Sequence, residues 1–239
     1  MQELLTIDRQ PTRWILTLNR PEKRNALSKD MVEALIEGVE TAHAEGVPLL
    51  VFRGMGKNLS AGFDFTDYET QSEGDLVLRM IRIETLLQLL ANSPALTVGL
   101  AHGKNFGAGV DLLAACKLRY CTPDVSFRMP GLKFDLVLGT RRFRHLVGPD
   151  NALSILGSAR SFQVDEALRI GFVTASMPES DWDALLDNAE QTATALTADT
   201  RASLYAALSL SDDQSDMAAL VRSASKPGFK NRIQQYLAG

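Results

Sequence analysis

The order of apolar and polar positions in the first hundred residues predicts strands separated by helices. Two strand-like stretches, "ELLTID" and "RWILTLNR", flank the turn residues 9–12 and are typical of a β-hairpin. Continuous apolar runs at 48–53 and 95–101 predict two buried strands. Ser28 is a good helix N-cap, and apolar residues recur after it at helical spacing: Met31, Ala34, Leu35, Val39 and Ala42.

Predicted helices become more frequent towards the C-terminal end of the chain. A polar loop over residues 57–74 leads into an amphipathic helix from about Asp75 to Ala91. A short helix and two short strands, "LRYCTP" and "VSFRMP", are expected after residue 101. From about Gly139 the pattern is helical, apart from the strand-like "GFVTASM". This order predicts an α/β core over residues 1–180 and a helical C-terminal region over residues 181–239.

Composition narrows the class of protein without identifying it. The chain has 239 residues, 45% of them hydrophobic and 23% charged, as in soluble globular proteins. The net charge of −4 argues against nucleic acid as the main partner. No apolar run is long enough to span a membrane, the N-terminal stretch lacks the pattern of a signal peptide, and two cysteines are too few for a disulfide framework. We therefore expect a cytoplasmic protein that binds neither nucleic acid nor membrane.

The stretch "NFGAGVDLLAACK", residues 105–117, places Gly-x-Gly between a predicted strand and a predicted helix. A dinucleotide-binding fingerprint needs a third glycine, but Leu112 occupies that position. A phosphate-binding loop around "RGMGKN" fails because Val51 and Asn58 stand where glycine and Ser or Thr are required. No metal-ligand spacing relates the three histidines, His43, His102 and His145.

Two loops with small residues follow two of the predicted strands. They are "NLSAGFDF" after strand 48–53 and "NFGAGVD" after strand 95–101, and glycine in each lets a ligand approach the backbone closely. The second loop opens a helix, whose first N–H groups lack intrahelical partners and carry the positive end of the helix dipole. Two such N–H groups from neighbouring loops predict an oxyanion hole, which stabilises negative charge that develops during a reaction.

These stretches resemble the enoyl-CoA hydratase/isomerase (crotonase) superfamily over nearly the whole chain. The resemblance is carried, in the family's order, by "LNRPEKRNALS", "LSAGFDF", "HGKNFGAGVDLLAAC", "SFRMPGL", "GTRRFRHLVG", "ALSILGSARSFQVDEALRIGFVT" and "KPGF". It implies a spiral of ββα units followed by a helical trimerisation region, and hence a homotrimer or a dimer of trimers.

The resemblance also implies an acyl-CoA thioester as substrate, with coenzyme A as part of that substrate and no metal or other cofactor. The backbone N–H groups of Ala61 and Ala108 would hold the thioester enolate. This anion forms only during the reaction, so the hole favours the transition state over the bound substrate. The resemblance assigns the coenzyme A groove to Lys23, Arg24, Gly62, Phe63 and Asp64.

The departures from the family concern the acids. Family hydratases use two carboxylates; here the first position is Asp111, and the second is Gly131, which has no side chain. Lys117 stands where the family usually has Asp, and Asp135 lies in a segment that aligns about three residues short, without an assigned role.

One carboxylate can move a proton between two carbons, whereas adding water needs a second group. We therefore expect an enzyme of the hydratase/isomerase type that hydrates poorly and uses Asp111. Two alternatives stay open: another crotonase chemistry, such as thioester hydrolysis or decarboxylation, and an acyl-CoA-binding protein without catalysis.

Overall fold

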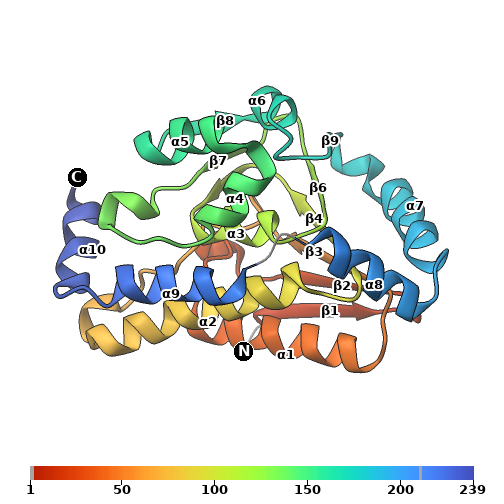
Figure 1. Ribbon diagram of the computed structural model, residues 1–239, viewed down its shortest axis with the longest axis horizontal. Helices are drawn as coiled ribbons and strands as arrows, with labels where there is room; N and C mark the ends of the chain where they lie inside the picture. The colour runs from red at the N-terminus through yellow and green to blue at the C-terminus, as the bar shows by residue number, and fades with distance from the viewer. Residues whose placement is uncertain (1–2, 210–211) are drawn as a thin grey trace.

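The computed structural model describes residues 3–209 and 212–239, and it confirms the predicted α/β class (Figure 1). Within these residues, one sheet has six strands in the order β1-β2-β3-β4-β6-β9, and the other has the order β5-β7-β8. The β1–β2 hairpin is antiparallel, and the other neighbours in the larger sheet are parallel. The strands are β1 (Leu5–Arg9), β2 (Arg13–Leu18), β3 (Leu49–Gly54), β4 (Leu96–Ala101), β5 (Lys104–Phe106), β6 (Leu118–Cys121), β7 (Ser126–Arg128), β8 (Ser161–Gln163) and β9 (Ala175–Ser176).

Side-chain caps fix where the first two helices begin. As predicted, Ser28 caps the first helix, and its side chain accepts a hydrogen bond from the Met31 N–H. The second helix begins two residues earlier than expected, because Ser72 and Asp75 form a capping box around its first turn. The helices are α1 (Lys29–Ala44), α2 (Glu73–Ala91), α3 (Ala108–Ala114), α4 (Thr140–Val147), α5 (Pro149–Ser158), α6 (Val164–Arg169), α7 (Trp182–Thr194), α8 (Ala198–Leu208), α9 (Asp213–Ala224) and α10 (Phe229–Ala238).

Two short strands were not predicted from the sequence. β5 overlaps the start of the "NFGAGVD" loop and pairs with β7, and β8 lies in a stretch that was predicted to be helical. Both are three residues long, too short for a periodic pattern to show. β5 matters for the site, because it fixes the chain directly before α3.

The larger sheet is buried on both faces. One face packs under α1, α2 and α3 in the main core, which contains Leu16, Phe52 and Leu87. The other face, with Val51 and Val98, packs against Trp182 and its neighbours on α7. Burying one such side chain stabilises the fold by about 1.5–3 kcal/mol, so both layers hold the strand ends in place.

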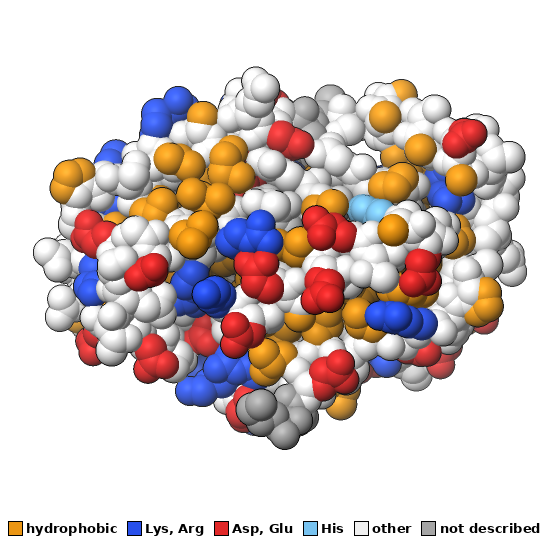
Figure 2. Space-filling view, turned by 90° about the horizontal axis from the view of Figure 1, so that it is seen from below, with side chains coloured by type: hydrophobic (Ala, Val, Ile, Leu, Met, Phe, Trp, Pro, Cys, Tyr) orange, Lys and Arg blue, Asp and Glu red, His pale blue; other side chains and the backbone are white. Residues whose placement is uncertain are grey.

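The chain after residue 181 is mainly helical, as predicted, while the proposed boundary at residue 180 and the trimer stay predictions. α9 runs along α2, and α10 packs against the 3-10 turn Gly131–Phe134 (Figure 1). No helix in the described ranges is both long and apolar enough to cross a membrane. On the face seen from below, acidic and basic side chains are interspersed (Figure 2).

Candidate active site

The two glycine-containing loops and the start of α3 enclose a cavity of about 430 Å³, completed by the turn Gly131–Phe134 and by α10. Apolar side chains dominate its inner wall, including Met80, Met129 and Leu138. The cavity brings together most of the residues that were assigned from the sequence: Lys23, Arg24, Ala61, Phe63, Asp64, Ala108, Asp111 and Gly131.

Gly62 lets the two loops touch. Its φ is +82°, and a Cβ there would overlap the Phe106 carbonyl and lie 3.1 Å from the Ala108 nitrogen. The side chain of Asn105 joins the same loops, because its Oδ1 accepts a hydrogen bond from the Ser60 N–H at 3.2 Å. The backbone of the first loop therefore lies directly beside the first N–H of α3.

The structure changes the identity of one predicted donor. The Ala61 N–H donates to the Arg24 carbonyl at 2.9 Å, so it is not a free donor in the cavity. Two residues further on, the Phe63 N–H has no hydrogen-bond partner within the described chain. The Ala108 N–H, the first of α3, likewise has no partner there, as predicted for a helix start.

Hydrogen bonding also orients the Phe63 N–H. The Gly62 carbonyl, which belongs to the same peptide unit, accepts a hydrogen bond from the Leu27 N–H at 2.7 Å. A trans peptide is planar and its C=O and N–H point in opposite directions. The Phe63 N–H is therefore directed away from Leu27.

Asp111 is the buried acid of the cavity, in the first turn of α3. Its side chain has no hydrogen-bond partner at Oδ1 in the described part of the chain, and a Cβ at Gly139 would overlap its carboxyl group. Burial raises the pKa of Asp111 well above its ordinary value; the positive charge of Arg142 opposes this shift, and Glu84 adds to it. The protonated form is favoured, so the ionised form is a strong base.

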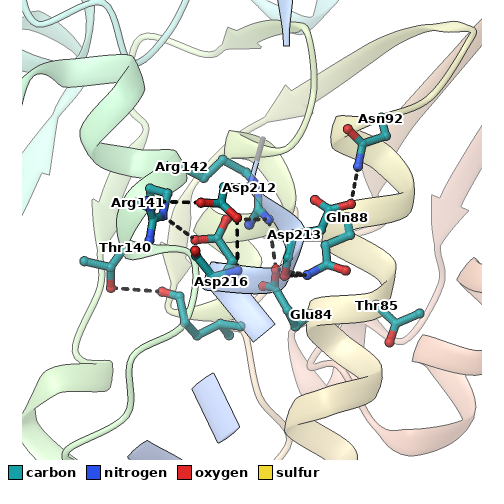
Figure 3. A network of polar contacts seen from close by, with 12 residues as sticks. Glu84, Thr85, Gln88, Asn92, Thr140, Arg141, Arg142, Asp212, Asp213 and Asp216 are labelled. Atoms are coloured by element: carbon teal, nitrogen blue, oxygen red, sulfur yellow. Dashed lines mark hydrogen bonds and ion pairs between the residues drawn. The ribbon is translucent and has the colours of Figure 1, made fainter. Parts of the chain in front are cut away.

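Arg142 and Glu84, whose charges act on Asp111, belong to an ionic network that the sequence analysis did not identify. Figure 3 shows this network. The Arg142 Nη2 lies 3.0 Å from Glu84 Oε1 on α2 and 3.7 Å from Asp216 Oδ2 on α9. Glu84 is completely buried and interrupts the apolar stripe of α2 between Met80 and Leu87. A charged residue within this apolar stripe was the signal that the sequence offered for the network. The other members, on α4 and α9, lie far away in the sequence.

The other carboxylates that line the cavity differ from Asp111. Glu22 is exposed, and Asp64 pairs with the Arg20 guanidinium. Burial would raise the pKa of Asp64, but hydrogen bonds from Arg20 and Thr66 outweigh it and the pKa is lowered.

Two further positions decide whether a second acid is present. Gly131 lines the cavity without a side chain, and Asp135 is exposed and lies outside the residues that line it. Among the described lining residues, Asp111 is thus the buried, unpaired carboxyl group.

Comparison with known proteins identifies the family. The sequence profile of the enoyl-CoA hydratase/isomerase family matches residues 12–234, and the chain belongs to this family. A crystal structure from Bordetella parapertussis, assigned to the enoyl-CoA hydratases/isomerases, is 66% identical and has a TM-score of 0.99 over all of both chains. An enoyl-CoA hydratase from Bacillus halodurans is 18% identical and has the same fold, with a TM-score of 0.84 over 98% of this chain and 100% of that one.

The crotonase-like fold predicted from the sequence is thereby confirmed. Among curated proteins, the chain is 32% identical to the mitochondrial Delta(3,5)-Delta(2,4)-dienoyl-CoA isomerase of Rattus norvegicus over 180 residues. That match covers 69% of this chain and 55% of the rat protein, so the chain spans about half the length of this relative.

Proposed function

We propose that this protein is an enzyme that acts on an acyl-CoA thioester and stabilises its enolate with the backbone N–H groups of Phe63 and Ala108. The observation that carries the proposal is a pair of N–H groups at one cavity that have no hydrogen-bond partner among residues 3–209 and 212–239, beside one buried carboxyl group. The pair differs from the predicted one, because Ala61 is replaced by Phe63. Donors fixed before the reaction stabilise developing charge without a cost of reorganisation.

Asp111 is the proton carrier in this proposal. Its ionised form removes a proton from a carbon next to the thioester or conjugated with it, and the enolate forms against the two N–H groups. The carboxyl group then returns the proton to another carbon, which is isomerisation. The name of the rat relative, a dienoyl-CoA isomerase, is consistent with this class of reaction.

Hydration is disfavoured by the acid count. A water molecule must be activated by one group while another delivers the α-proton, and each such group typically contributes about 10²–10⁴-fold. Gly131 supplies no side chain where a second acid is expected. The apolar inner wall also offers few partners for a positioned water molecule.

We propose that coenzyme A binds where Lys23 and Arg24 line the cavity, because both residues are exposed and can pair with its phosphates. No cofactor beyond coenzyme A is proposed. The assembly is proposed to be a homotrimer or a dimer of trimers, and sedimentation velocity at micromolar protein tests it.

The activity test uses two substrates in parallel. We expect 3-hexenoyl-CoA to be converted to the conjugated 2-enoyl thioester, followed by chromatography and ultraviolet absorbance, while crotonyl-CoA gains little or no water. Asp111→Asn should lower kcat far more than it weakens binding. Release of free coenzyme A or of CO₂ would support the alternative chemistries, and tight binding without turnover would support a binding protein. Rapid hydration of crotonyl-CoA would refute the acid count.

A further inference from the structure

Arg79 on α2 contacts the loop that carries the Phe63 N–H. Its Nη2 donates to the Asp64 carbonyl at 2.6 Å, and its guanidinium carbon lies 4.1 Å from the centre of the Phe63 ring. Its Nη1 donates to Gln71 at 3.3 Å, and the residue is only 9% exposed. One buried side chain thus holds both the ring of Phe63 and the carbonyl of the following residue.

Other groups hold the same loop as well. Leu27 pairs with it through two backbone hydrogen bonds, from the Leu27 N–H to the Gly62 carbonyl and from the Asp64 N–H to the Leu27 carbonyl. Arg20 pairs with the Asp64 carboxylate. The contacts of Arg79 are different, because they hold the ring of Phe63 and the carbonyl group of Asp64.

Arg79 does not line the substrate cavity. It lines a neighbouring cavity of about 670 Å³, which shares Asp64 and Thr66 with the first. The loop therefore lies between Arg79 and the substrate cavity. The loop separates the Arg79 guanidinium from a thioester bound in that cavity.

A buried guanidinium is a costly way to fill this space. Burial lowers the pKa of Arg79, although the nearby negative charge of Asp64 opposes this, and its Nε has no hydrogen-bond partner among the described residues. An apolar side chain of similar length would avoid the cost of removing a charge from water. The benefit that offsets this cost comes from its contacts with Phe63, Asp64 and Gln71.

We propose that Arg79 is a positioning residue that holds the Phe63 N–H beside the Ala108 N–H, and so sets how well the site stabilises an enolate. The inference rests on the proposed function. Loss of Arg79 frees the Phe63 ring and the Asp64 carbonyl but leaves the Leu27 pairing, so the donor is misdirected and not removed. Removing a donor completely from such a site costs about 10²–10³-fold in rate, which is the upper limit for the effect.

The test compares Arg79→Met and Arg79→Lys with the matched control Arg82→Met. Arg82 lies one turn further along α2, where it pairs with Glu33 on α1 at 2.6 and 2.7 Å. Each protein is incubated with butyryl-CoA in D₂O, and exchange of the α-protons measures enolate formation directly. The dissociation constant and the infrared frequency of the bound ¹³C-labelled carbonyl are measured with the same thioester.

We expect Arg79→Met to slow exchange by about 10–100-fold, a part of what full loss of a donor costs. It should also reduce the downward shift of the carbonyl frequency while changing the dissociation constant by less than about threefold. Arg79→Lys keeps the charge but not both contacts, so it should lie between Arg79→Met and wild type. Arg82→Met should match wild type.

Wild-type exchange and carbonyl shift in Arg79→Met would overturn the positioning role and leave the proposed function standing. If Arg79→Met does not fold, a folded Arg79→Lys with wild-type exchange would overturn it in the same way. Absence of both exchange and carbonyl shift in the wild-type protein would instead overturn the proposed function, and this inference with it.

Discussion

Replacing Asp111 by Asn should make the protein less sensitive to alkaline pH. The two side chains have the same shape, and Asn is neutral at every pH. Asp111 is 3% exposed, and burial raises its pKa well above the ordinary value. Wild type must therefore either keep a proton that the unfolded chain releases or accept a buried charge.

The direction of the effect follows from proton binding. A carboxyl group whose pKa is raised by folding binds its proton more tightly in the folded state. The stability it contributes is complete below its unfolded pKa, near 3.9, and is lost as the pH rises through the folded pKa. Each unit by which the pKa is displaced corresponds to about 1.4 kcal/mol. A shift of even one pKa unit therefore changes the free energy of unfolding enough to be measured by denaturation.

Urea denaturation at pH 5 and pH 9, at one protein concentration, is the assay. We expect the free energy of unfolding to fall more in wild type than in Asp111→Asn between these values, with Asn the more stable protein at pH 9. The buried Glu84 also has a raised pKa, caused by burial, but it is present in both proteins and its own contribution largely cancels. Parallel pH dependence in the two proteins would refute the raised pKa of Asp111.

Two further substitutions test the site. Gly62→Ala should abolish turnover and destabilise the protein by several kcal/mol, because the new Cβ overlaps the Phe106 carbonyl at a φ that disfavours alanine; activity and thermal unfolding check this, and an active, stable variant would contradict the contact between the loops. Glu84→Gln should lower the pKa of Asp111 and move the kcat/KM profile to more acidic pH. Arg142→Met should raise that pKa and move the profile to more alkaline pH. Equal kcat/KM profiles in wild type and both variants would show that Glu84 and Arg142 do not control the pKa of Asp111.

Much of the framework could be predicted from local patterns. The hairpin, the Ser28 cap and the short helix after the Gly-x-Gly stretch depend on residues close together in the sequence, so local patterns identified them. Family motifs extended this to the loops and to Asp111. These features need no knowledge of distant contacts.

The exact donor could not be predicted in this way. Ala61 and Phe63 occupy the same loop, and the hydrogen bond from the Ala61 N–H to Arg24, 37 residues earlier in the chain, distinguishes them. The Glu84–Arg142 pair could not be predicted either, because the two residues lie 58 positions apart on different helices. Sequence patterns report which face of an element is buried, but not which polar groups meet there.

The network around Arg142 has a consequence for how the molecule unfolds. α9 supplies Asp216 to Arg142, and α10 supplies Tyr236 to the wall of the cavity. Detaching α9 would cost the ion pair between Asp216 and Arg142 and leave Arg142 beside the buried Glu84. Such a penalty couples the late helices to α2 and α4, so the C-terminal segment should open together with them as one cooperative unit. Native-state hydrogen exchange should therefore give the amides of α9 and the middle of α2 the same opening free energy.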